Sequence, residues 1–146
     1  GGLLFGWAKP VPVIASNLRS PRRDMGLVAA AGPGANLLMA LAWGIALKAM
    51  TLAGVGQEFF LRMAIAGILV NIALAVLNLI PVPPLDGGRI VTSLLPTRLA
   101  LSYSRLEPYG LFILLGLLAT GLLGGIVGPM VEAGVGLLAT LLSLNS

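Results

Sequence analysis

Charged residues divide this 146-residue chain into long apolar stretches. The chain is uncharged between Asp24 and Lys48, between Arg62 and Asp86, and between Glu107 and Glu132. A helix needs about 20 apolar residues to cross the hydrocarbon core of a bilayer. Each stretch is long enough, so the pattern predicts spanning helices at 25–47, 61–80 and 109–128. A shorter apolar stretch at 133–144 predicts a further helix that is tilted, re-entrant or interfacial, or a span that depends on its neighbours.

The composition is that of a membrane protein. Hydrophobic residues make up 58% of the chain and charged residues 10%, against roughly 25% charged residues in a soluble domain. The mean hydropathy is +1.01. We therefore predict an all-α polytopic membrane protein in which residues 1–146 form one membrane-embedded domain. The net charge of +4 does not indicate a nucleic-acid partner, because the basic residues lie in loops beside apolar spans and form no stripe.

The basic residues orient the predicted spans in the bilayer. The segment before the first span carries Lys9, Arg19, Arg22 and Arg23, and the loop after the second carries Arg89, Arg98 and Arg105. The loop between these spans has only Lys48 and Arg62 as basic residues. Basic loops favour the cytoplasmic side. The pattern therefore predicts an integral membrane protein with Asp86 near the cytoplasmic face.

Residues 1–24 differ from the spans that follow them. Pro10 and Pro12 lack amide donors, which argues against a continuous helix. We predict an extended strand or hairpin at the membrane surface, with Trp7 at headgroup depth. The chain begins Gly1-Gly2 and its first methionine is Met25, so we interpret it as the C-terminal part of a longer protein.

The first polar interruption of a span is Ala31-Gly32-Pro33-Gly34-Ala35-Asn36. Pro33 removes a backbone donor, and the flanking glycines let another backbone come close. One interpretation is a broken helix whose carbonyls and Asn36 amide line a cavity or a buried site. The other is a small-residue helix contact with a proline kink.

Asp86 stands at the edge of the second predicted span. A carboxylate at the edge of a hydrocarbon layer is costly to keep ionised, so we interpret it as a metal ligand, a proton carrier or a substrate contact. Pro81, Pro83 and Pro84 end the helix, and the two glycines after Asp86 permit a tight turn. This pattern predicts that Asp86 lies on an irregular segment.

Two asparagines precede Asp86 in the second span. Asn71 and Asn78 are seven residues apart and therefore share one helix face. Together with Asp86 they suggest a polar interior site. The alternative is an interhelical hydrogen-bond ladder beside a surface turn. In the third span, Gly121 with Gly125 and Gly124 with Gly128 have the spacing of helix-packing residues, which permits a homo-oligomer.

Two motifs together resemble the site-2 protease family of intramembrane zinc metalloproteases. They are Gly32-Pro33-x-x-Asn36 in one span and Asn78-x-x-Pro81-x-Pro83-x-Leu85-Asp86-Gly87 after the next. The segments from Phe5 to Pro12 and from Leu106 to Gly110 are similar to the compact prokaryotic members. The resemblance extends from about Phe5 to Gly128.

The resemblance implies a function and roles for four residues. Family members hydrolyse a peptide bond in or near a substrate transmembrane helix, with a zinc-activated water as nucleophile. Asp86 matches the aspartate that binds Zn²⁺. Asn36 matches an asparagine near the catalytic centre, with a role toward the substrate backbone or the developing oxyanion. Asn78 and Pro81 are implied substrate contacts. The implied partners are the lipid bilayer and a transmembrane helical protein, in a prokaryotic cell membrane.

The chain departs from the family pattern because it has no histidine. The family binds zinc with two histidines of a His-Glu-x-x-His helix, which lies on an earlier span, so the zinc site of this chain is expected to be incomplete and the chain alone inactive. The chain is then a fragment or a degenerate member that binds without cleaving. The alternatives from other classes are a non-catalytic membrane scaffold and a transporter module with broken helices.

Overall fold

The computed structural model describes residues 21–144, and these residues form helices and turns without a strand. The elements in chain order are α2 (Pro21–Leu52), α3 (Glu58–Asn78), α4 (Asp86–Leu94), α5 (Thr97–Ser104), the 3₁₀ helix η2 (Glu107–Tyr109), α6 (Gly110–Ala119) and α7 (Leu122–Leu141). The predicted all-α fold is confirmed. The predicted extended segment lies almost wholly outside the described residues.

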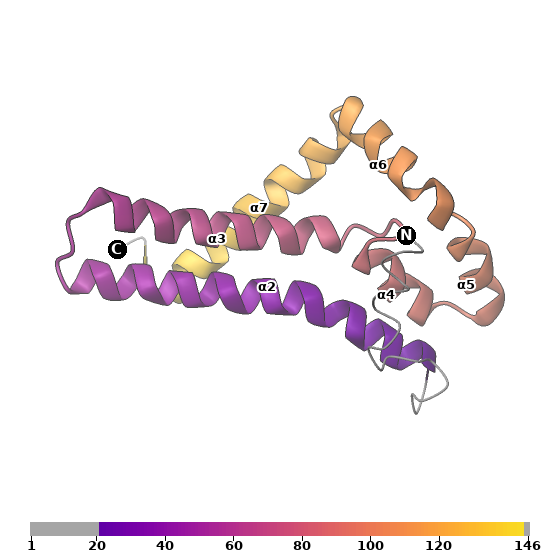
Figure 1. Cartoon of the computed structure of the whole chain (residues 1–146), viewed down its shortest axis with the longest axis horizontal. Helices are drawn as coiled ribbons and strands as arrows, with labels where there is room; N and C mark the ends of the chain where they lie inside the picture. The colour runs from indigo at the N-terminus through magenta and orange to yellow at the C-terminus, as the bar shows by residue number, and fades with distance from the viewer. Residues whose placement is uncertain (1–20, 145–146) are drawn as a thin grey trace, which may run out of the picture.

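The two longest helices, α2 and α3, form an antiparallel pair (Figure 1). They match the first two predicted spans, and both are long and apolar enough to cross a membrane. The two helices are in close contact where the Trp43 ring of α2 packs on Gly67 of α3, because a Cβ added at Gly67 would be 2.5 Å from the ring. Ala40, Ile68 and Ile72 form the buried cluster beside this contact.

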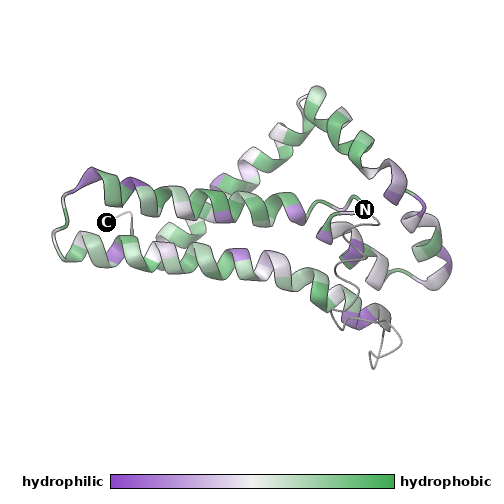
Figure 2. Ribbon diagram, in the orientation of Figure 1, coloured by the Kyte–Doolittle hydropathy of each residue, from purple (hydrophilic) through white to green (hydrophobic). Residues whose placement is uncertain are grey.

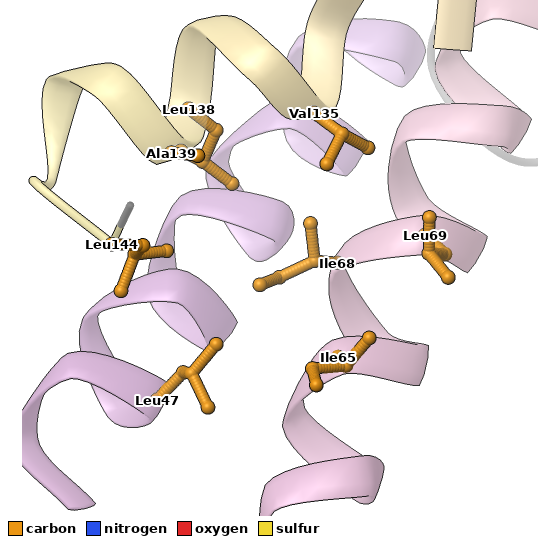
Figure 3. A pocket seen from close by; sticks show the side chains of 8 residues that line it. All are labelled: Leu47, Ile65, Ile68, Leu69, Val135, Leu138, Ala139 and Leu144. Atoms are coloured by element: carbon orange, nitrogen blue, oxygen red, sulfur yellow. The ribbon is translucent and has the colours of Figure 1, made fainter. Parts of the chain in front are cut away.

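Helix α7 crosses the α2–α3 pair and completes this core. Ile72 of α3 packs on Gly134, where an added Cβ would be 2.9 Å from its Cγ2. Lys48 donates a hydrogen bond of 3.1 Å from Nζ to the carbonyl oxygen of Ser143, just beyond the end of α7. Between the three helices lies an apolar cavity of about 170 Å³ (Figure 3). Its lining residues are Leu47, Ile65, Ile68, Leu69, Val135, Leu138, Ala139 and Leu144.

The C-terminal half is divided at a different place from the one the sequence predicts. The predicted span at 109–128 is interrupted, since α6 ends at Ala119 and α7 begins at Leu122. Gly121 between them has a φ of 79°, a left-handed conformation that ends a right-handed helix. Helix α7 then runs through Pro129 to Leu141, and the third helix long enough to span is α7. In Figure 1, α6 and α7 make two sides of a triangle on the α2–α3 pair.

The outer surface of these helices is apolar (Figure 2). Large hydrophobic side chains point outward on all of the long helices; Leu38 of α2 is 69% exposed and Leu137 of α7 is 74% exposed. In water this much exposed apolar surface would be unfavourable. It suits an integral membrane protein whose outer face meets lipid.

Candidate functional site

Asp86 is the first residue of α4, which corrects the prediction that it lies on an irregular segment. The irregular part is the turn at 79–85, which follows the end of α3 at Asn78 as the prolines predict. Leu85 is still extended, with φ −65° and ψ 159°, and the helix begins at the next residue. A carboxylate in the first helical turn is stabilised by the unsatisfied amides and the dipole of the helix. The Asp86 side chain is half-buried.

The two glycines after Asp86 are required because the turn packs directly on them. Both are buried. A Cβ at Gly87 would collide with the carbonyl oxygens of Leu79 and Ile80, and a Cβ at Gly88 would be 2.5 Å from the nitrogen of Pro83. The sequence suggested glycine for turn flexibility, whereas its structural role here is close packing of backbone on backbone. The turn also contains a cis peptide bond between Pro83 and Pro84.

Two residues later in the chain also contact this turn. The Tyr103 hydroxyl of α5 donates a hydrogen bond to the carbonyl oxygen of Pro81. Burial raises the pKa of the Tyr103 phenol, so the hydroxyl remains a donor at neutral pH. Gly110, at the start of α6, lies against the carbonyl of Pro83, and a Cβ there would be 2.6 Å from Pro84 Cδ. Sequence reasoning missed both contacts, because no local pattern links a tyrosine to a turn 22 residues earlier.

Helix α4 packs antiparallel on the first part of α2, and the contact is made at two glycines. Ser93 of α4 lies against Gly26, where an added Cβ would collide with its side chain. Seven residues earlier on α4, the Asp86 carboxylate lies against Gly32, and Oδ2 would be 2.9 Å from an added Cβ. Asp86 therefore faces α2 at the glycine of the Gly-Pro motif.

Asn36 shares this glycine with Asp86. Its Nδ2 donates a hydrogen bond of 3.5 Å to the Gly32 carbonyl one turn earlier, and its side chain is half-buried. Helix α2 is continuous through Pro33, so the broken-helix interpretation is corrected and the proline lies within a helix that bends in its N-terminal part (Figure 1). The fold thus brings Gly32, Asn36 and Asp86 together.

The other predicted polar residues use their polar atoms in local contacts. Asn71 donates a hydrogen bond of 2.8 Å to the carbonyl of Gly67, and Asn78 donates one of 2.9 Å to that of Leu74. Both bonds are within α3, so the two amide donors form no interhelical ladder. Pro81 is exposed and offers its carbonyl to Tyr103. The roles of Asn36, Asn78 and Pro81 toward a substrate stay predictions.

The described residues do not gather a cluster of metal-binding side chains around Asp86. Residues 21–144 contain no group of three or more His, Cys, Asp or Glu side chains that could hold a metal ion. The sequence as a whole has no His and no Cys. A catalytic zinc takes about three protein ligands and one open position. Asp86 is the carboxylate that lies at the Gly32 contact.

The sequence profile of peptidase family M50 matches residues 44–120, just over half of the chain. The chain belongs to this family, which confirms the resemblance to site-2 proteases. The match includes Asp86, Tyr103 and Gly110, and it begins after Asn36.

One curated relative shows how much of a whole protein the chain represents. "Putative zinc metalloprotease YwhC" of Bacillus subtilis (strain 168) is 34% identical over 140 residues, which cover 89% of this chain and 62% of that protein. The chain therefore spans less than two thirds of this relative's length. No solved structure matches the chain.

Proposed function

We propose that this chain supplies Asp86 as one zinc ligand of an intramembrane metalloendopeptidase. The observation that carries the proposal is the position of the Asp86 carboxylate against Gly32, beside Asn36, in a chain of peptidase family M50. A carboxylate oxygen is a common zinc donor. The packing of α4 on α2, and the contacts of Tyr103 and Gly110 with the turn at 79–85, restrict the position of the Asp86 side chain. A metal ligand needs such support.

The remaining ligands come, in this proposal, from a segment outside residues 1–146. In this proposal a His-Glu-x-x-His helix, which the family resemblance implies, lies N-terminal to Phe5, and part of the relative YwhC lies outside its alignment with this chain. Such a helix would bring both histidines and a glutamate as general base to the Asp86 side of α2. Residues 1–146 alone would then bind zinc weakly and hydrolyse no peptide.

Zinc, when bound, lowers the pKa of a coordinated water to about 7 and so supplies a nucleophile at neutral pH. The residues of this chain would orient the metal and the substrate. Asp86 would hold the metal at the cytoplasmic edge of the bilayer. Asn36 would turn its amide from the long bond to Gly32 toward the substrate carbonyl, whose developing negative charge a donor stabilises.

The substrate in this proposal is a transmembrane helix that has locally unwound. Helical backbone amides and carbonyls are satisfied within the helix, so a peptide bond becomes accessible only when the helix opens. Asn78 and Pro81, at the end of α3 and in the turn before Asp86, would contact the opened strand. The transporter alternative rests on helices broken at Pro33 and at the prolines after Asn78. The first of these breaks is absent, because α2 is continuous through Pro33.

The test of the proposed function measures zinc and cleavage in the complete natural protein purified in detergent. We expect about one zinc per protein, and the loss of both zinc and cleavage of a helical membrane substrate in Asp86→Ala. Glu107→Ala is the matched control, because Glu107 is an exposed carboxylate at the same end of the molecule. Undiminished zinc in Asp86→Ala would remove this residue from the site, and a zinc-free natural protein would refute the proposal.

A further inference from the structure

With α3 spanning the membrane, the helix lengths put the segment after α3 at the membrane surface. The 21 residues of α3 extend about 31 Å at 1.5 Å per residue. This length matches a hydrocarbon core of about 30 Å, so Asn78 reaches one edge of the core. The nine residues of α4 and the eight of α5 are too few to cross it. Figure 1 shows both short helices at and beyond the Asn78 end of the α2–α3 pair.

Helix α5 has one face toward the protein and a mixed basic and apolar face outward. Ala100 is buried and Tyr103 reaches the turn before Asp86. Arg98 and Arg105 are seven residues apart, as are Leu99 and Leu106, so each pair shares one side of the helix. The backbone stays helical through Arg105 and Leu106. We define the α5 surface as Arg98, Leu99, Leu101, Arg105 and Leu106, all of them exposed.

The leucines of the α5 surface are too exposed for a surface in contact with water alone. Leu99 is 54% exposed and Leu101 is 61% exposed. The two arginines have no carboxylate partner in residues 23–144, where the recorded ion pair is Arg62 with Glu58 at the opposite end of α3. Glu107 is close in sequence to Arg105 and forms no ion pair within that range. The two guanidinium groups are therefore available to an anion from outside the chain.

We propose that the α5 surface binds anionic phospholipid, with the leucines in the acyl boundary and Arg98 and Arg105 on lipid phosphates. An exposed short helix with leucines beside arginines at headgroup depth is the pattern of an interfacial helix. Two positive charges at headgroup depth attract the phosphates of anionic lipid. The inner face of α5 holds the Pro81 carbonyl, so lipid on the outer face would fix the helix that supports the turn before Asp86.

The test is lipid binding by the complete protein in a nonionic detergent, measured by native mass spectrometry. The protein is titrated with phosphatidylglycerol and, separately, with phosphatidylcholine of the same acyl chains. We expect tighter binding of phosphatidylglycerol, and a loss of this preference on the order of tenfold in the double variant Arg98→Gln, Arg105→Gln. The control removes two cations from the opposite end, Lys48→Gln with Arg62→Gln, and should retain the preference.

The conservative double variant separates charge from folding. Arg98→Lys with Arg105→Lys keeps both positive charges, so it should retain most of the preference. An equal loss in the lysine and glutamine variants would overturn the proposal, because charge would then not be the determinant. An unchanged preference in the glutamine variant would also overturn it and would leave the leucines as a surface for another protein segment. Neither measurement depends on zinc or on proteolysis.

Discussion

The Asp86 carboxylate is in contact with the backbone of α2 at Gly32, where a Cβ would be 2.9 Å from Oδ2. A hydrogen atom at this position is what allows α4 to approach α2 closely enough for Asp86 and Asn36 to share one glycine. The glycine of the Gly-Pro motif therefore helps to position an aspartate that lies 54 residues later in the chain. This contact connects the two motifs of the sequence.

Gly32→Ala should weaken zinc binding without lowering thermal stability. A helical alanine is more favourable than glycine by about 1 kcal/mol, so thermal stability should be kept unless α4 shifts. The added methyl group displaces the Asp86 carboxylate, and zinc affinity of the complete protein should fall on the order of tenfold. Gly34→Ala is the control, since nothing lies within 4 Å of a Cβ there. Zinc titration with a competing chelator measures the effect; equal affinities in both variants would contradict the proposed role of Gly32.

Tyr103→Phe should loosen the turn before Asp86 without altering the α2–α3 core. The variant removes the hydrogen bond to the Pro81 carbonyl, which is worth about 1 kcal/mol. Burial raises the pKa of the folded phenol above the ordinary 10.0. The contribution of the hydroxyl is therefore complete below pH 10 and is lost as the pH rises through the higher folded pKa.

The check is the pH dependence of thermal unfolding between neutral and strongly alkaline pH. The natural chain should lose more stability above pH 10 than the Tyr103→Phe variant does. Tyr109→Phe is the control, because Tyr109 is 61% exposed and should behave like the natural chain. Parallel profiles for all three proteins would show that the Tyr103 hydroxyl does not hold the turn.

Gly110→Ala should destabilise the protein because the new methyl group would meet backbone. The Pro83 carbonyl and Pro84 Cδ occupy that space, and a backbone cannot move aside as a flexible side chain does. Overpacking of this kind costs about 1–3 kcal/mol. Gly116→Ala, in the same helix with nothing within 4 Å, should be neutral or slightly stabilising. Thermal unfolding of both variants in the same detergent compares them, and equal midpoints would contradict the close packing at Gly110.

The sequence predicted the features of the site that depend on local chemistry. Prolines after Asn78 ended α3 as expected, and the charge pattern located two of the three membrane helices. The Gly-Pro and Asp-Gly motifs were recognised separately. Their contact through Gly32 depends on α4 lying antiparallel on α2, and α4 itself was not predicted. Neither apolar length nor residue spacing carries information about which helices pack together.

The third span shows the limit of reasoning from apolar length. Residues 109–128 are uniformly apolar, and hydropathy alone cannot distinguish one long helix from two helices with a turn between them. Gly121, Gly124, Gly125 and Gly128 were interpreted as helix-packing residues. The structure assigns one of them a conformational role, since Gly121 has a φ of 79° and the other three do not have a positive φ.

Gly121→Ala should therefore destabilise the protein more than alanine at any neighbouring glycine does. A non-glycine residue in the left-handed region costs roughly 1–2 kcal/mol, and the variant would favour a straight helix through the α6–α7 junction. Gly124→Ala has open space and a right-handed conformation and should gain stability from helix propensity. Opposite shifts of the unfolding midpoint are expected for the two variants. A stabilised Gly121→Ala protein would mean that α6 and α7 form one continuous helix, as the hydropathy pattern predicts.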